Sequence, residues 1–315
     1  MHKQPPGLVT LIKTVSKLPI RFLQGIAKGL TYTLINLTKA KTLHAARLNL
    51  DIAFPDISAQ KNEQLRKQAA INEMTAYFEF FKIWGSSTQQ NIDRIHYVEG
   101  EKYLRDAIEK GHGVVLVIPH FGTWEVMNAW VSQYTPMTIM YKPLKNTAVD
   151  QFVREARSRQ KANLVPTDET GVKQVFKTLK QGGTTAILPD HSPDFEGDFT
   201  NWFGIPLYSS HLIAKMVQKT KASALLLYAF RNDNGGFDMF IESLPEQIQD
   251  RQTNGTALIH EAMENLIHRY PEHYHWSYKR FKANPDLRRI YDLPYEQAIT
   301  IIRKMQADNH YLSGQ

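Results

Sequence analysis

A regular alternation of strand-like and helical segments constrains the fold of this chain most strongly. Apolar runs of strand length, bounded by turn residues, cover 114–118, 137–141, 163–166, 184–188, 224–230 and 237–244. Helical stretches separate most of them, at 147–161, 171–181, 209–219 and 255–270. Helical crossovers allow successive strands to run parallel and cover the sheet from both sides. The chain is therefore predicted to be an α/β protein with a largely parallel central sheet and helices on both faces.

Two details refine this prediction. The last two strand runs are separated only by the turn-rich stretch 232–236, which favours a hairpin at an edge of the sheet. Ser58 opens a long helical stretch ending near Gly85. Its large apolar residues recur at spacings of three and four, and are expected to face the core or to line a hydrocarbon-binding site: Met74, Tyr77, Phe78, Phe81 and Trp84.

A histidine and a carboxylate follow the first of the strand runs. His120 and Glu125 lie five positions apart, so on one continuous helix they would point about 140° apart and can meet only across a turn. Gly122 would provide that turn, and Thr123 is expected to cap a helix that holds Glu125 in its first turn. Such a pair suits proton abstraction from a hydroxyl, with the imidazole as base and the carboxylate as its orienting partner.

Other chemistries lack their residues. The chain has no cysteine, which excludes a thiol acyl-enzyme, and no serine stands in a G-x-S-x-G elbow. The spacings H-x3-H and H-E-x-x-H are missing, so neither a metal nor another cofactor is expected. Gly111, Gly113 and the pair at 182–183 are not followed by a P-loop lysine, so nucleotide binding is not expected. No nucleic acid partner is expected either. An alternative is that His120 and Glu125 merely end a strand and begin a helix.

Several sequence blocks resemble a known family. The segment from His120 to Glu125 resembles the H-x4-[D/E] motif of the lysophospholipid acyltransferase superfamily, and the chain from about Ala45 to Pro285 resembles its lipid A late (lauroyl and myristoyl) acyltransferases. The matching blocks occur in that family's order: Asn49-Leu50 with Phe54-Pro55, Met140-Tyr141-Lys142-Pro143 with Asn146, Arg157-Ser158-Arg159, Leu188-Pro189-Asp190-His191, Phe203-Gly204, Trp276, and Arg280-Phe281-Lys282 with Pro285. Two positions depart from the pattern, since Trp202 replaces the first phenylalanine of F-F-G and Lys142 replaces the commoner arginine.

The resemblance implies a glycerolipid acyltransferase-like fold and an O-acyltransferase of lipopolysaccharide biosynthesis. The implied donor is an acyl chain on acyl carrier protein, and the implied acceptor is a 3-hydroxyacyl hydroxyl of a Kdo-bearing lipid A precursor. His120 would be the base and Glu125 its orienter. The implied location is the cytoplasmic face of the bacterial inner membrane.

Four further residues are candidates for substrate binding. Lys142 ends one strand run and Asp190 follows another, and ligands bind beyond the carboxyl ends of parallel strands. Lys142 suits a phosphate by its charge. Asp190 could bind a polar group of the substrate, hold an arginine or cap a turn. Arg157 and Arg159 lie near a helix end, where the helix dipole alone favours cations, so a solvated or capping role is the alternative.

The positive charge of the chain is concentrated at its N-terminus. Residues 1–50 contain eight Lys or Arg and no acid, whereas the other 265 residues carry 30 bases and 31 acids. On a helix, the bases Lys13, Lys17, Arg21 and Lys28 form one wedge beside an apolar face of Leu11, Val15, Leu18, Phe22, Ile26 and Leu30. Pro19 is expected to divide the run into two helices. No stretch of about 18 apolar residues exists to span a membrane.

Residues 1–45 are therefore predicted to be a membrane-associating segment, and residues 46–315 the acyltransferase domain. The alternative for the segment is an amphipathic helix that covers the domain core. Two alternatives for the function stay open. One is a glycerophospholipid acyltransferase, although 188–191 stands where its F-P-E-G block belongs. The other is a non-catalytic protein that binds a membrane surface.

Overall fold

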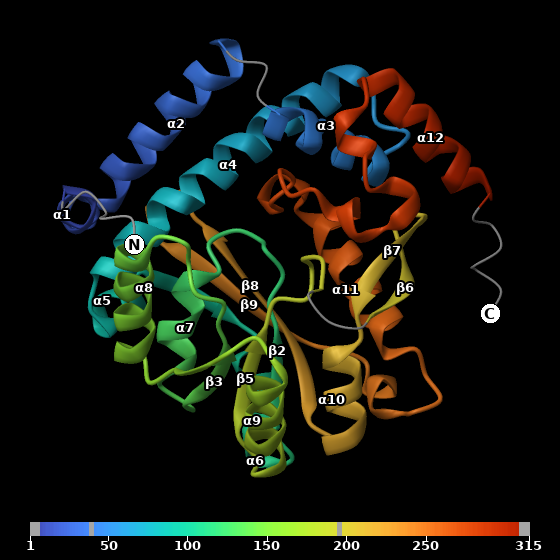
Figure 1. Cartoon of the computed structure of the whole chain (residues 1–315). Coiled ribbons are helices and arrows are strands. Elements are labelled where there is room, and N and C mark those ends of the chain that lie inside the picture. The colour runs from blue at the N-terminus through green and yellow to red at the C-terminus, as the bar shows by residue number, and fades with distance from the viewer. Residues whose placement is uncertain (1–6, 38–40, 194–196, 309–315) are drawn as a thin grey trace.

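A seven-stranded sheet forms the centre of the molecule (Figure 1). The computed structural model describes residues 7–37, 41–193 and 197–308. The strands lie in the order β1 (Ile95–Glu99), β9 (Phe237–Ser243), β8 (Ser223–Arg231), β2 (Val114–Val117), β5 (Thr184–Ile187), β3 (Met137–Met140) and β4 (Asn163–Val165). β8 and β9 pair antiparallel, and the other neighbouring pairs are parallel. The prediction of a largely parallel sheet is confirmed.

Both faces of the sheet are covered by packed apolar side chains. Every residue of β2 is buried, and alternate residues belong to two separate cores, with Val115 and Val117 in one and Val114 and Leu116 in the other. The covering helices are α6 (Glu101–Glu109), α7 (Glu125–Val131), α8 (Thr147–Arg159), α9 (Glu169–Lys180), α10 (Leu212–Thr220) and α11 (Gly255–Arg269). This two-sided burial explains why the strand runs are continuously apolar rather than alternating.

Three strands were not predicted. β1 carries polar side chains and is only partly buried, as is common for an edge strand. The predicted β8–β9 hairpin is confirmed. It does not form the edge of the sheet, because β1 pairs with the outer side of β9. A separate two-stranded sheet consists of β6 (Gly197–Trp202) and β7 (Ile205–Ser210), so α10 begins after this hairpin and not at residue 209.

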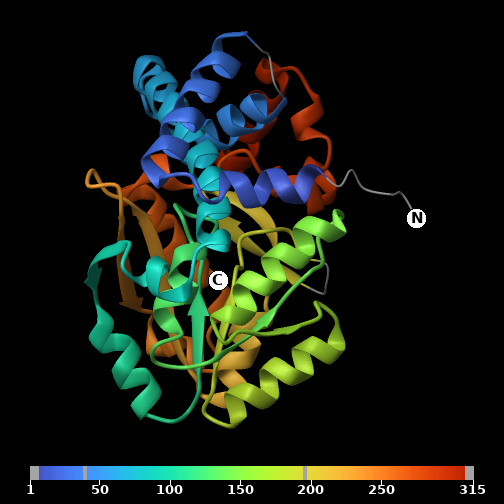
Figure 2. The same ribbon diagram turned by 90° about the vertical axis from the view of Figure 1, so that its left-hand side faces the viewer.

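Helices before β1 pack over one end of the sheet. They are α1 (Gly7–Val15), α2 (Ile20–Leu37), α3 (Lys41–Ala53), α4 (Ala59–Gly85) and α5 (Thr88–Ile92). The break at Pro19 and the Ser58 cap of α4 are confirmed. α2 lies outside α4, as the blue and cyan ribbons of Figure 2 show. Within the described ranges, no helix is long and apolar enough to cross a membrane.

The C-terminal part consists of short 3-10 turns and one helix. After α11 these turns are η2 (Pro271–His273), η3 (Arg280–Ala283), η4 (Pro285–Leu287) and η5 (Ile290–Asp292), followed by α12 (Tyr295–Asp308), which packs beside α3. A further turn, η1 (Glu246–Gln249), lies between β9 and α11. α4 differs from its prediction, because its most buried residues include Ala76, Phe80 and Ile83, whereas Tyr77 is 44% exposed.

Candidate active site

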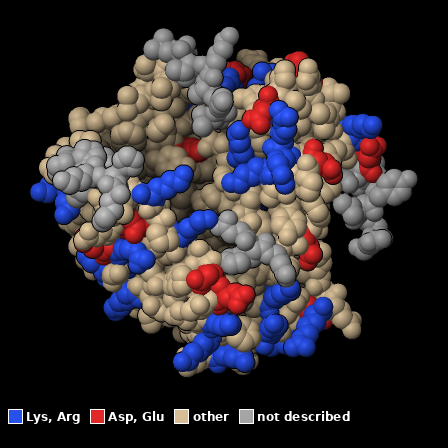
Figure 3. Space-filling view, in the orientation of Figure 1, with Lys and Arg blue, Asp and Glu red and all other residues tan. Residues whose placement is uncertain are grey.

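A cavity of about 630 Å³ opens at the carboxyl ends of the parallel strands. Its rim includes His120, Lys142, His191 and Lys282. Much of its wall is apolar and is formed by β2 with the residue after it, β3, β5 and α7 through Leu116, Ile118, Met127, Val131, Met137, Ile139 and Ala186. Figure 3 shows lysine and arginine side chains around a hollow on this face of the molecule. The cavity thus combines a long apolar slot with a polar, basic mouth.

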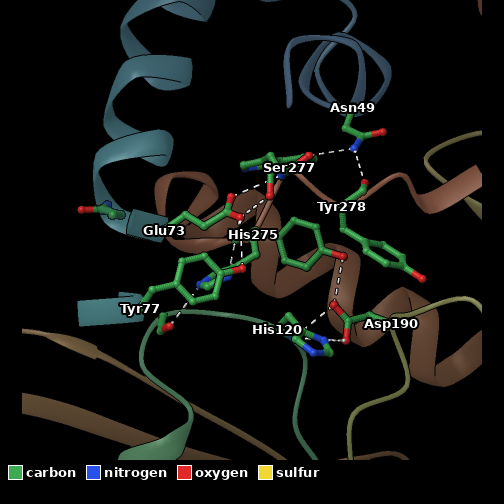
Figure 4. A network of polar contacts seen from close by, with 12 residues as sticks. Asn49, Glu73, Tyr77, His120, Asp190, His275, Ser277 and Tyr278 are labelled. Atoms are coloured by element: carbon green, nitrogen blue, oxygen red, sulfur yellow. Dashed lines mark hydrogen bonds and ion pairs between the residues drawn. The ribbon is translucent and has the colours of Figure 1, made fainter. Parts of the chain in front are cut away.

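His120 is bonded to Asp190 at this mouth (Figure 4). The ring Nδ1 lies 2.8 Å from Asp190 Oδ1, and the backbone N–H of His120 donates to the same carboxylate at 3.1 Å. Tyr274 Oη donates to Asp190 Oδ2 at 3.1 Å. Asp190 is 1% exposed. Burial alone would raise its pKa, but His120 beside it and Arg280 lower the pKa of Asp190 below its ordinary value, so the carboxylate is ionised.

The predicted pairing of His120 with Glu125 is wrong. The Glu125 carboxylate accepts hydrogen bonds from Trp84 Nε1 at 2.9 Å and Arg157 Nη2 at 2.5 Å. Asp190 takes the predicted place beside the imidazole because β5 lies next to β2, which brings the loops after both strands together. Glu125 is the first residue of α7 and lines the cavity, but its carboxylate is bonded to Trp84 and Arg157 instead of His120.

The backbone between His120 and Glu125 explains this geometry. Gly122 has φ of 54°, and a Cβ there would lie 2.0 Å from the Ala229 carbonyl oxygen, so the close approach requires glycine. The amides of Gly122 and Thr123 donate to His273 O at 2.7 Å and Ala229 O at 2.8 Å. Thr123 does not cap α7 as predicted, because its hydroxyl donates to the buried Glu79 carboxylate at 2.6 Å.

The structure separates the predicted basic residues. Lys142 lies on the cavity rim. Arg157 lines the cavity but is paired with Glu125; although burial disfavours its charge, that carboxylate raises the pKa of Arg157. Arg159 donates from Nη2 to Trp84 O at 2.5 Å and is not among the described residues that line this cavity. The structure thus brings Lys142 and Arg157 to the site and leaves Arg159 outside it.

The segment 273–280 forms part of the site and was not predicted to do so. Its backbone is tied to the His120 loop, since His275 N donates to His120 O at 3.1 Å. Asn49 Nδ2 donates to the carbonyls of Trp276 and Tyr278, and Glu73 accepts from the Ser277 hydroxyl (Figure 4). The blocks around Trp276 and Arg280 were the available signal, although they were interpreted as structural.

Arg280 is a buried cation close to the Asp190 carboxylate. It is 4% exposed, its Nη1 lies 3.8 Å from Asp190 Oδ2, and its guanidinium stacks on Trp202 at 4.2 Å from the ring centroid. A buried carboxylate needs such compensation. Among the described residues, no group of three or more His, Cys, Asp or Glu could hold a metal ion.

Comparison with known proteins assigns the family. A family model described as bacterial lipid A biosynthesis acyltransferase matches residues 8–283. The chain belongs to this family. It is 25% identical over 283 residues to the lipid A biosynthesis lauroyltransferase of Escherichia coli K12, covering 86% of this chain and 89% of that protein. It is 24% identical over 243 residues to the palmitoleoyltransferase of the same strain, covering 76% and 78%.

A third relative is a lipid A biosynthesis acyltransferase of Haemophilus influenzae, 26% identical over 287 residues that cover 88% of this chain and 90% of the relative. The family predicted from the sequence blocks is confirmed. The chain is therefore an acyltransferase of the lipid A biosynthesis family.

Proposed function

We propose that this acyltransferase moves an acyl chain from acyl carrier protein to a 3-hydroxyacyl hydroxyl of a Kdo-bearing lipid A precursor. The observation that carries the proposal is the His120–Asp190 pair at the mouth of an apolar slot. With Nδ1 bonded to Asp190, the ring has Nε2 as its second nitrogen for the acceptor hydroxyl. A base at this position and a hydrocarbon slot below it are the two requirements of transfer from a fatty thioester.

The reaction needs no covalent enzyme intermediate. His120 Nε2 removes the hydroxyl proton, and the hydroxyl oxygen bonds to the thioester carbonyl carbon. The tetrahedral intermediate then collapses with cleavage of the carbon–sulfur bond, and the imidazolium returns its proton to the departing thiolate. The ionised Asp190 stabilises the imidazolium between these two steps. The amides of Gly122, Thr123, Val126 and Met127 already donate to backbone carbonyls, so none of these four is assigned to oxyanion binding.

The part of the cavity wall formed by β3 and the residues after it is about as long as a fatty acyl chain. From Lys142 on the rim to Met137 at the start of β3, an extended backbone covers roughly 16 Å. One leaflet of a bilayer has a hydrocarbon layer of about 15 Å, which acyl chains fill. We therefore place the acyl chain of the donor along β2, β3 and β5, with its thioester at His120. Lys142 and Lys282 on the rim are the residues expected to meet anionic groups of the substrates.

The N-terminal helices are proposed to bind the cytoplasmic face of the inner membrane. Of the six apolar residues predicted for this contact, three lie outward, since Leu11 is 58%, Phe22 55% and Leu30 48% exposed, whereas Val15, Leu18 and Ile26 are partly buried. Lys13 on α1, Lys28 on α2 and Lys17 in the turn between the two helices are also exposed. Exposed apolar side chains beside bases suit insertion into an anionic interface. Lys3 and Lys39 of the predicted basic segment lie outside the described residues.

Transfer assays with the purified full-length protein test the proposal. We expect mass spectrometry to show one added acyl group when laurate is supplied on acyl carrier protein and the acceptor carries Kdo. Coenzyme A as carrier and a Kdo-free acceptor are the matched comparisons. Equal transfer from both carriers, or to both acceptors, would contradict the corresponding part of the proposal. Membership of this family favours lipid A over a glycerophospholipid acceptor and catalysis over simple membrane binding.

A further inference from the structure

Three aromatic rings form a parallel stack at the mouth of the cavity. The His120 and His191 rings lie with centroids 3.6 Å apart and planes within 2°. Tyr278 stacks on the other face of His191, with the two ring centroids 3.7 Å apart and an interplanar angle of 8°. The three residues follow three different elements, β2, β5 and η2. Such alignment depends on tertiary packing and not on local backbone preference.

One hydrogen bond does not fix the plane of an imidazole. The χ2 torsion of histidine is broad, so a ring bonded only through Nδ1 can still swing about that bond. The edge of Trp124 contacts the His120 ring at a centroid distance of 4.9 Å and 73°. His191 covers a ring face and is therefore the contact that opposes rotation of the ring out of its plane.

We propose that His191 is a positioning residue, whose flat ring keeps the His120 imidazole in the orientation that bonds Asp190 through Nδ1 and presents Nε2 to the acceptor hydroxyl. This inference rests on the proposed role of His120 as the base. Tyr278 stabilises the position of His191, because its ring stacks on His191 and its hydroxyl accepts a hydrogen bond at 3.0 Å from the N–H of Ser192, the next residue. Asn49 in turn holds the Tyr278 carbonyl at 2.9 Å.

The electrostatic surroundings agree with a neutral, non-reacting ring. Partial burial in the cavity wall and the neighbouring His120 lower the pKa of His191 to about 3, with Asp190 opposing and Arg280 and Lys282 reinforcing the shift. His191 therefore stays uncharged while His120 takes up a proton. A second cation at 3.6 Å would instead disfavour the imidazolium that the reaction needs.

Ring shape and ring chemistry are separated by two substitutions. His191→Phe keeps a flat ring without nitrogens, and His191→Leu removes the flat ring. We expect His191→Leu to lower kcat roughly 10–100-fold with KM within about twofold of wild type, the usual scale for misplacing a catalytic group. His191→Phe should keep kcat within about threefold of wild type. His268→Leu is the matched control, because His268 contacts Phe54 and Phe203 away from the cavity, and its kcat should be unchanged.

A readout without turnover distinguishes this proposal from the proposed reaction. In protein labelled with ¹⁵N-histidine, the His120 ring should show one Nδ1–H tautomer in wild type and His191→Phe, and mixed or broadened signals in His191→Leu. Wild-type kcat or unchanged signals in His191→Leu would overturn the positioning role, as would a loss in His191→Phe equal to that in His191→Leu. Full activity of His120→Ala would instead overturn the proposed base.

Discussion

At the scale of single residues, two carboxylates near His120 have different partners. Asp190 bonds the imidazole, while Glu125 joins Trp84 and Arg157. The H-x4-E spacing therefore marks the site without stating which carboxylate orients the base. In this geometry Glu125 links α7 to α4 and α8, and so holds the cavity wall together.

Neutral isosteres at the two carboxylates distinguish these roles. We expect Asp190→Asn to lower kcat about 10²–10⁴-fold, because the amide neither fixes the tautomer nor stabilises the imidazolium. Glu125→Gln should keep kcat within about tenfold but lower Tm, because the Arg157 charge loses its counter-ion. Steady-state kinetics and thermal unfolding of both variants check this. A kcat defect larger in Glu125→Gln than in Asp190→Asn would mean that Glu125 orients the base.

Glu264 on α11 predicts a pH-dependent stability. Its carboxylate accepts from Phe203 N–H at 2.9 Å, and burial raises its pKa to about 7. A carboxyl whose folded pKa exceeds the unfolded value stabilises the protein when protonated, and that stability is lost as the pH rises from about 4.5 to 7. Glu264→Gln should therefore gain Tm relative to wild type at pH 8 and little at pH 5. Thermal scans at both values check this, and a pH-independent difference would contradict it.

At the scale of elements, the length of the slot depends on how α7 packs against three strands. Ala186 on β5 is a small side chain on the slot wall, 6% exposed. A larger residue there removes space for the far part of an acyl chain without touching His120. Chain-length preference is thus a property of packing between elements.

Ala186→Leu should shift donor preference toward shorter chains. Excluding one methylene from an apolar pocket changes specificity about 10–200-fold, so we expect a loss of this size for the longest accepted donor. Transfer of a short acyl chain in the same variant is the internal control. Competition between acyl carrier protein donors of several lengths measures the shift, and an unchanged preference would place the acyl chain elsewhere.

At the scale of the whole molecule, α2 belongs to the packed fold. Its residues Leu23 and Ala27 are fully buried, and the Gln24 side chain donates from Nε2 to Glu79 Oε1 on α4 at 2.8 Å. The same carboxylate accepts from Thr123 in the His120 loop and from Arg231 at the end of β8. Removing the N-terminal helices would therefore disturb the site as well as any membrane contact.

Surface substitutions test membrane binding without this damage. Replacing exposed Phe22 and Leu30 by serine should weaken flotation with anionic vesicles while Tm stays near wild type. Charge reversal at Lys13, Lys17 and Lys28 should weaken binding more at low salt than at high salt. Arg21 is left unchanged because it donates to Asn234 O at 2.8 Å. Unaltered flotation after both changes would contradict the proposed membrane-binding surface.

The sequence by itself determined the properties that depend on neighbouring residues. Apolar runs such as 114–118 predicted buried strands, and the helical stretches between them predicted the parallel sheet, because periodicity reports which side of each element is buried. Ser58 and Pro19 placed a helix start and a helix break through local backbone chemistry. The ordered blocks placed His120, Lys142, Arg157 and Asp190 near one site.

The tertiary structure alone decided the pairings within that site. His120 and Asp190 are separated by 70 positions, and nothing in their local sequence states that β5 lies beside β2. The same adjacency lets His191 stack on His120, and the segment after η2 brings Tyr278 to the other side. Contacts of this kind follow from which strands become neighbours, and strand order is set by packing of the whole chain and not by the periodicity of any one segment.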